Sequence, residues 1–143
     1  MLTEPVIVVL VKDYLTTKGY TGFIIAPTRS HGDDLVATSP RGDFTLHVEA
    51  KGETSSDERS KRYGKQFSSA QYRDHAATAI YKALCMRSYS TPEKPRKVAL
   101  ALPDNRSKRN FLTPTEAALR ELGIGVFWVR PDKSVVFDAD WSL

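Results

Sequence analysis

Two carboxylates and one lysine are spaced as a divalent metal site would require. Asp34 opens a short apolar run, and Lys51 stands two positions after Glu49. Carboxylate oxygens are the hard ligands that Mg²⁺ prefers, and a nearby ammonium group can stabilise negative charge that develops during a reaction. Residues of these types, held together, indicate metal-assisted hydrolysis of a phosphate ester.

A β-hairpin is the element that would bring these residues together. Apolar and polar residues alternate on both sides of residues 40–43, whose two central residues are predicted to form the loop, with residue 40 opposite residue 43. In that register Asp34 lies opposite Glu49. Because side chains alternate along a strand, Asp34, Glu49 and Lys51 would share one face of the sheet.

The alternative is an ordinary strand with one solvated face, since most alternating patterns mean no more than that. Two like charges placed directly opposite each other destabilise a sheet, which argues against the ordinary strand for Asp34 and Glu49. A bound cation would remove that repulsion. The register decides between the alternatives, because a slip of one residue would move Glu49 and Lys51 to the other face.

The composition is that of one soluble domain over residues 1–143, with 41% hydrophobic and 27% charged residues. The single cysteine, Cys85, excludes a disulfide within the chain and a zinc site made of cysteines. Three scattered histidines, His31, His47 and His75, do not form a zinc motif. No stretch is long enough to span a membrane, and a cytoplasmic location is expected.

Positive charge is grouped along the chain rather than spread evenly, within a net charge of +4. Both groups are predicted to lie in loops. Cationic loops beside a carboxylate cluster suit a phosphodiester substrate, and the alternative is solubilising surface charge. The first group comprises Arg59, Lys61, Arg62 and Lys65, and the second comprises Lys94, Arg96, Lys97, Arg106, Lys108 and Arg109.

The periodicity predicts the order helix, three strands, helix, strand, helix, two strands, which is an α/β fold with a mixed sheet flanked by helices. The first helix is expected from about Glu4 to Lys18 and the second from about Gln66 to Met86. A capping box at Thr113-Pro114-Thr115-Glu116 is expected to start the third helix. The expected strands are 23–26, the two arms of the hairpin, 98–102, 125–129 and 134–137.

With this order beside Asp34 and Glu49-Ala50-Lys51, the chain resembles the PD-(D/E)xK nuclease superfamily, also called restriction endonuclease-like. The resemblance covers Glu4 to about Val129. Gly32-Asp33-Asp34-Leu35-Val36 is similar to the family's acidic motif, and Asp33 stands where the family has proline. Either Asp33 or Asp34 could therefore be the ligand, and Asp34 is preferred because two apolar residues follow it.

The resemblance implies roles for particular residues. Asp34, Glu49 and the Ala50 carbonyl would bind Mg²⁺ or Mn²⁺, and Lys51 would orient the attacking water or stabilise charge. Glu4 would supply the acidic residue of the first helix, although an acid in a first helical turn is equally explained by the helix dipole. Gln71, or alternatively Gln66, would be the family's helix glutamine. Candidates for contacts with the nucleic-acid backbone are Lys61, Arg62, Lys65, His75 and Lys82.

The expected activity is Mg²⁺-dependent endonuclease cleavage of DNA. The alternative is a nucleic-acid-binding module of the same fold that has lost turnover and acts within a larger complex. A homodimer is a further expectation, because cutting both strands of a duplex requires two sites. A partner protein from a restriction, repair or mobile-element system is also considered.

Overall fold

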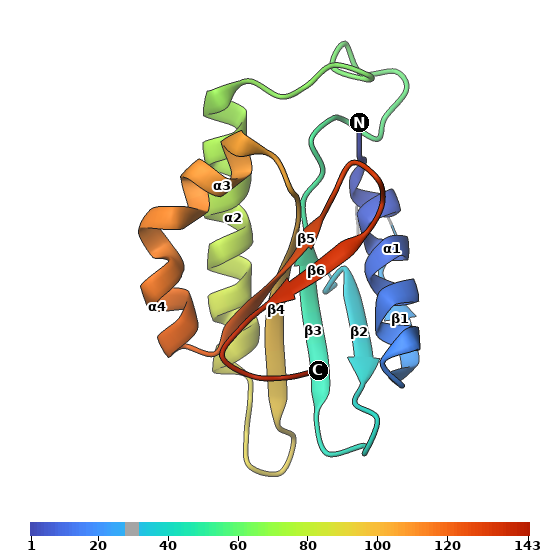
Figure 1. The fold of residues 1–143 in the computed structure, drawn as a ribbon, viewed down its shortest axis with the longest axis vertical. Coiled ribbons are helices and arrows are strands. Elements are labelled where there is room, and N and C mark those ends of the chain that lie inside the picture. The colour runs from blue at the N-terminus through green and yellow to red at the C-terminus, as the bar shows by residue number, and fades with distance from the viewer. Residues whose placement is uncertain (28–31) are drawn as a thin grey trace.

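The computed structural model describes residues 1–27 and 32–143, which form a six-stranded mixed sheet flanked by helices (Figure 1). The strands lie in the sheet in the order in which they occur in the sequence. The elements are α1 (Glu4–Thr17), β1 (Thr21–Ile25), β2 (Leu35–Thr38), β3 (Thr45–Ala50), α2 (Ser69–Ser88), β4 (Arg96–Pro103), α3 (Arg106–Leu112), a 3₁₀ turn η1 (Thr113–Thr115), α4 (Glu116–Glu121), β5 (Ile124–Val129) and β6 (Val135–Asp138).

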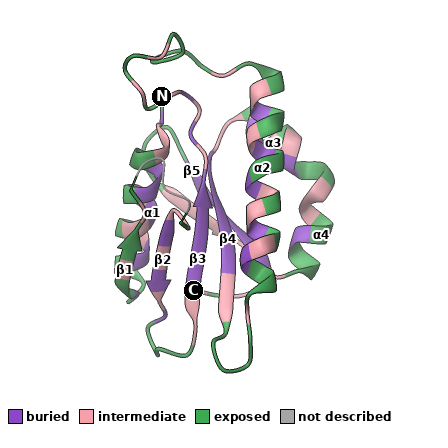
Figure 2. Ribbon diagram, turned by 180° about the vertical axis from the view of Figure 1, so that it is seen from behind, coloured by how far each residue is buried: buried purple, intermediate pink, exposed green. Residues whose placement is uncertain are grey.

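The centre of the sheet is parallel and its margins are antiparallel. β3 pairs with β4, and β4 with β5, in parallel, whereas the β1–β2, β2–β3 and β5–β6 pairs are antiparallel. The central strands are buried along most of their length, and β1 at the edge is largely exposed (Figure 2). Their composition follows from this position, because a strand covered on both faces needs apolar residues at successive positions.

Each face of the sheet has its own hydrophobic core. On one face, Ile7, Val11 and Leu15 of α1 pack against a cluster that includes Val48 and Ala50 of β3. On the other face, α2, α3 and α4 cover a second cluster. The residues that β4 and β5 contribute to it alternate along each strand with those that they contribute to the first cluster. The charged face of β3 lies on the α2 side, so Glu49 is buried under a helix and not exposed as a solvated strand would leave it.

The hairpin has the predicted register and a longer loop. β2 pairs with β3 through Leu35↔Val48 and Thr38↔Thr45. The residue numbers of each pair add to 83, as they do for the predicted pair of residues 40 and 43, so the register is the predicted one. Beyond Thr38, the Ser39 amide donates to the Phe44 carbonyl at 3.0 Å and residues 40–43 form the turn. The predicted pairing of residues 40 and 43 is therefore wrong, but a four-residue loop centred on the same point leaves the register unchanged.

The segment after β4 differs most from prediction. Asn105 caps α3 by accepting from the Lys108 amide at 2.9 Å, so the basic residues of 106–109 lie on a helix and not in a loop. Arg96 and Lys97 likewise belong to β4. α3 continues to Leu112, and Thr113 after it already has a helical backbone conformation. The predicted capping box at Thr113 therefore does not form, and the Thr113 hydroxyl donates instead to the Arg109 carbonyl. Across the described ranges, no helix combines the length and apolarity needed to cross a membrane.

Candidate metal and phosphodiester site

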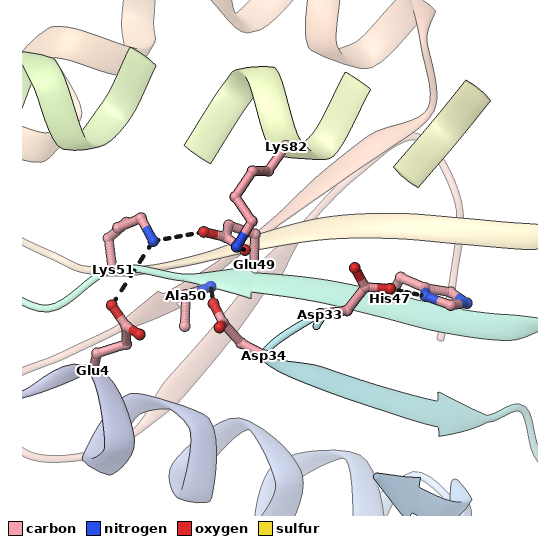
Figure 3. A network of polar contacts seen from close by, with 8 residues as sticks. All are labelled: Glu4, Asp33, Asp34, His47, Glu49, Ala50, Lys51 and Lys82. Carbon is pink, nitrogen blue, oxygen red and sulfur yellow. Dashed lines mark hydrogen bonds and ion pairs between the residues drawn. The ribbon is translucent and has the colours of Figure 1, made fainter. Parts of the chain in front are cut away.

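The end of β3 and the start of β2 bring the predicted acidic residues to one place (Figure 3). Asp34 immediately precedes β2, and its Oδ2 accepts a hydrogen bond of 2.8 Å from the Ala50 amide of β3. β2 begins only at Leu35 and does not extend to the level of Ala50. The Asp34 side chain therefore supplies the acceptor that a further β2 residue would have provided. This contact fixes the carboxylate of Asp34 beside the strand that carries Glu49.

Glu49 is a fully buried carboxylate held between two lysines. Its Oε1 lies 2.5 Å from Nζ of Lys51, which directly follows the end of β3. Its Oε2 lies 2.6 Å from Nζ of Lys82, which reaches down from α2 (Figure 3). The second contact is an ion pair that lacks the angles of a hydrogen bond. A buried carboxylate without such partners would be very costly, so the two ammonium groups offset the cost of burying the Glu49 side chain.

Glu4 joins the cluster from the first turn of α1. Its Oε2 lies 3.8 Å from Nζ of Lys51. Glu4, Asp34, Lys51 and Lys82 also line an open cavity of about 290 Å³, whose other wall is the apolar side of α1 together with Ile25 and the two residues after β1. The cavity wall is therefore partly charged and partly apolar, and we call its charged residues, together with the buried Glu49 that pairs with Lys51 and Lys82, the Asp34–Glu49 site.

The structure separates the two adjacent aspartates. Oδ2 of Asp33 lies 2.6 Å from Nδ1 of His47, and Nε2 of His47 lies 2.9 Å from the Thr45 hydroxyl. Asp33 is thus engaged further back along β3, whereas Asp34 lies with Ala50 and Glu49 (Figure 3). The sequence left open which of the two is the ligand, and the geometry favours Asp34. His31 lies outside the described residues.

The two candidate glutamines have other partners. Oε1 of Gln71 accepts from the Ser68 amide at 3.0 Å, and the Ser68 hydroxyl accepts from the Gln71 amide, which forms the capping box of α2. Gln66 lies against the Tyr72 hydroxyl. The structure therefore does not bring Gln71 to Glu49 and Lys51, and its observed contacts are those of a helix cap.

The residues predicted to contact nucleic acid lie in three different settings. Lys61, Arg62 and Lys65 are exposed on the 51–68 loop between β3 and α2, which lies at the end of the sheet where α1 begins (Figure 1). The centres of the His75 and Phe67 rings lie 4.5 Å apart, and His75 lines a cavity that Lys51 also lines. Lys82 differs from all of these, because it is an ion-pair partner of Glu49.

Sequence reasoning named Lys82 as a nucleic-acid contact and Lys108 as a loop residue, and it missed the ion pair of the first and the burial of the second. The pairing of Lys82 with Glu49 had a signal, since Lys82 lies on the polar stripe of the helix that covers β3. Lys108 had none: it stands in a basic segment, yet only 1% of it is exposed and its Nζ has no hydrogen-bond partner among the described residues.

Burial sets the electrostatics of the site. It raises the pKa of the Asp34 carboxyl to about 6, and the charges of Glu49 and Glu4 act in the same direction. The Ala50 amide and Lys51 oppose this shift. Burial alone would lower the pKa of Lys82, but its contact with Glu49 raises it above its ordinary value. The favourable charge of Lys51 therefore does not offset the effects of burial and of the two glutamates on the pKa of Asp34, although Glu49 is paired with two lysines.

We expect Asp34→Asn to stabilise the protein above pH 6. The pKa of Asp34 rises from 3.8 to about 6 on folding, so the folded state favours the protonated carboxyl and ionisation costs stability as the pH rises. After allowance for solvent screening, the gain at pH 8 is about 1–2 kcal/mol. It disappears below pH 3.8, where the carboxyl is protonated in both states. Urea unfolding at pH 8 and pH 3.5 measures the difference, and an Asp34→Asn variant no more stable than wild type at pH 8 would contradict it.

The donor groups at the site fit a hard divalent cation. Mg²⁺ prefers oxygen ligands and keeps several waters, and the carboxylates of Asp34 and Glu49 with the Ala50 carbonyl are oxygen donors of that kind. A cation would also relieve the repulsion that raises the pKa of Asp34. Among the residues that the structure describes, no three His, Cys, Asp or Glu side chains form a metal-binding group. Two carboxylates would therefore need the Ala50 carbonyl and water to complete the ligand shell.

Comparison with known proteins leaves the family open. No protein-family model matches the chain, and no curated protein matches it. Among solved structures, the chain is similar to SfsA from Pyrococcus furiosus, determined in complex with Ca²⁺, with a TM-score of 0.38 and 12% identity. The similarity covers 94% of this chain and 61% of SfsA, so the chain spans about three-fifths of that protein. At this level the likeness assigns no activity, and the function has to be argued from the site.

Proposed function

We propose that the chain is a metal-dependent nuclease that hydrolyses phosphodiester bonds in DNA at the Asp34–Glu49 site. The observation that carries the proposal is the fully buried Glu49 carboxylate paired with Lys51, which lines a cavity together with Asp34 and Glu4. Buried charge is expensive to maintain, and clusters of it in a cavity are typical of sites that do chemistry.

Each residue has a part in that chemistry. Asp34, Glu49 and the Ala50 carbonyl would hold Mg²⁺ or Mn²⁺, and the bound ion would polarise a phosphoryl oxygen and lower the pKa of a bound water. Lys51, 2.5 Å from Glu49, would donate to the attacking water or to a phosphoryl oxygen as negative charge grows there. Glu4, 3.8 Å from Lys51, would hold that ammonium in place while it makes this contact.

The distribution of cations supports a nucleic-acid substrate. The exposed Lys61, Arg62 and Lys65 lie on the 51–68 loop, and Ser55 and Ser56 of the same loop line a cavity that includes Lys51. Phosphate contacts by lysine and arginine supply most of the affinity for nucleic acid that does not depend on sequence. The loop that carries these cations therefore also contributes to the wall of the cavity that Lys51 lines.

Lys82 is expected to compete with the metal for Glu49. Its Nζ lies 2.6 Å from Glu49 Oε2, an oxygen that a metal ion would approach. Lys82→Met should therefore tighten Mn²⁺ binding about tenfold, the change expected when one opposing charge is removed near a partly buried ion. Calorimetric titration measures this, with Lys61→Met on the exposed loop as the control. Weaker Mn²⁺ binding by Lys82→Met than by wild type would show that Lys82 assists the site rather than competing in it.

The test of the proposed function is cleavage of labelled linear, nicked, branched and single-stranded DNA with Mg²⁺ or Mn²⁺, and with EDTA as the blank. We expect wild type to cut at least one of these substrates, and Glu49→Ala and Lys51→Ala to bind it without cutting. If wild type binds DNA and cuts none of them, while both variants bind equally well, the alternative of a binding module without turnover replaces the nuclease. Absence of binding at low salt would contradict both.

A further inference from the structure

A second cavity lies on the other side of Lys51 from the Asp34–Glu49 site. Its volume is about 360 Å³, and Glu4 and Lys51 line both cavities. Its remaining wall comes from the 51–68 loop and from α2. We call it the Lys51–His75 pocket, and the residues used below are Lys51, Ser55, Ser56, Phe67, His75 and Thr78.

The buried Lys108 lies behind this pocket. Its Nζ is 4.9 Å from the centre of the Tyr72 ring, Tyr72 packs edge-on against Phe67, and Phe67 packs against His75. The charge of Lys51 lowers the pKa of Lys108, and the charge of Lys108 lowers the pKa of His75; Lys51 and His75 both line the pocket. These contacts place the ammonium group one layer of side chains behind the pocket wall.

Lys108 lacks the partner that a buried ammonium group requires. Only 1% of the residue is exposed, and Nζ has no hydrogen-bond acceptor among the described residues. Burial, and then Lys51, lower its pKa to about 8. The nearest acid, Glu53, is engaged elsewhere, because its carboxylate accepts from the Leu2 amide at 2.8 Å and from Asn105 Nδ2 at 3.0 Å. The Tyr72 ring is a weaker partner for a buried ammonium group than an anion would be, so an anion bound in the adjacent pocket would explain why Lys108 is buried here.

The groups around the pocket suit a phosphate oxygen. Lys51 and Lys108 supply positive charge, His75 supplies ring nitrogens, and Ser55 and Ser56 supply hydroxyl groups, whereas the Thr78 hydroxyl donates to the Asp74 carbonyl at 2.9 Å. Burial lowers the pKa of His75, and Lys108 and then Lys51 lower it further, so these two lysines outweigh nearby Asp74 at the imidazole. A phosphate group held here would share Lys51 with the substrate group at the Asp34–Glu49 site.

We propose that the Lys51–His75 pocket binds a second phosphate group of the nucleic-acid substrate, next to the one that reacts, with the buried Lys108 as its electrostatic support. This inference rests on the proposed function. The phosphate is either a terminal monoester or the internal diester of the neighbouring nucleotide. Both present anionic oxygens to the same lysines and hydroxyl groups, and the experiment below distinguishes them.

The test measures binding in EDTA, so it does not depend on catalysis. One probe is a thymidine dinucleotide with a 5′-terminal phosphate, and the other is the same dinucleotide with only its internal phosphodiester. NMR titration gives the affinities for wild type, Lys108→Met and Ser56→Asp, with Lys94→Met as the control on a remote loop. Lys108→Met removes the charge and keeps an unbranched side chain, and its Tm is expected to equal or exceed that of wild type. Ser56 is exposed, so its replacement leaves the fold intact.

We expect Lys108→Met, which removes a positive charge behind the pocket wall, and Ser56→Asp, which adds a negative charge to that wall, each to weaken binding about tenfold. The control should stay within about twofold of wild type. If wild type prefers the terminal phosphate and loses this preference in Lys108→Met, the ligand is a monoester. If both probes bind equally and weaken equally, it is the internal diester.

The proposal is overturned if wild type binds neither probe, or if Lys108→Met binds both as wild type does. Its failure and that of the proposed function can be told apart. Metal-dependent cleavage that is lost in Glu49→Ala but unaffected by Lys108→Met would leave the nuclease standing without this pocket. Probe binding that is sensitive to Lys108→Met, in a protein that cuts no DNA, would leave the pocket standing without the nuclease.

Discussion

Glu49→Gln is expected to lower metal-dependent DNA cleavage by about a thousandfold, which corresponds to the several kcal/mol that a bound metal ion supplies in the transition state. The substitution keeps the size of the side chain and removes its charge. Glu49 is fully buried between Lys51 and Lys82, so the neutral amide weakens both ion pairs and replaces a proposed anionic ligand of the metal with a neutral one. Single-turnover cleavage at saturating enzyme measures the effect on the chemical step.

The matched control for Glu49→Gln is Glu121→Gln, the same change at an exposed position at the end of α4. It should cleave as wild type does. Circular dichroism and DNA binding of Glu49→Gln should show a folded protein that still binds its substrate. Cleavage by Glu49→Gln within about threefold of wild type would mean that the carboxylate is not a metal ligand in the reaction.

Gly52→Ala should both destabilise the fold and disturb the site. Gly52 is buried against the start of α1, where an added Cβ would lie 2.7 Å from the Glu4 backbone nitrogen and 3.0 Å from the Leu2 carbonyl oxygen. Backbone atoms cannot move aside as a flexible side chain does. The helix start must shift, at a cost of about 1–3 kcal/mol, and Glu4 moves away from Lys51 with it. Thermal unfolding and cleavage per folded molecule are the measurements.

Gly42→Ala separates the loss of stability from the loss of the site. Gly42 has a φ of +70° in the hairpin turn, with open space where a Cβ would lie, so alanine is strained there at a cost of about 1–2 kcal/mol. It is remote from Lys51. Gly42→Ala should lose stability yet keep the cleavage rate of wild type, whereas Gly52→Ala loses both. Equal cleavage rates for the two variants would show that the approach of α1 to β3 does not matter for the chemistry.

The hairpin was predictable because its register depends on local alternation. A slip of one residue would have moved Leu46 and Val48 out of the core under α1 and placed polar residues of β3 there, so the sequence pattern selected the observed pairing. Loop length was not selected in the same way, because two-residue and four-residue loops centred on one point give the same register. The side chain of Ser39 favoured the longer loop, since its hydroxyl donates to the Asp43 carboxylate and accepts from the Asp43 and Phe44 amides.

The residues that prediction missed depend on contacts between distant segments. α3 has a polar, basic sequence without a clear apolar stripe, and it is held by Leu112 in the core and by the Asn105 cap. The burial of Lys108 follows from the packing of α3 on α2, which no local pattern reports. Asp33 and Asp34 are adjacent and chemically identical, and only the position of His47 separates their roles.

The central claim is that Asp34 and Glu49 form one divalent metal site, and titration with Mn²⁺ followed by electron paramagnetic resonance tests it most directly. Free Mn²⁺ gives a strong signal that binding diminishes, so occupancy is read without any substrate. The account predicts one bound ion per chain in wild type and in Asp33→Asn, and loss of that binding in Asp34→Asn and in Glu49→Gln. Binding that is absent at millimolar Mn²⁺, or equally strong in all four proteins, would contradict it.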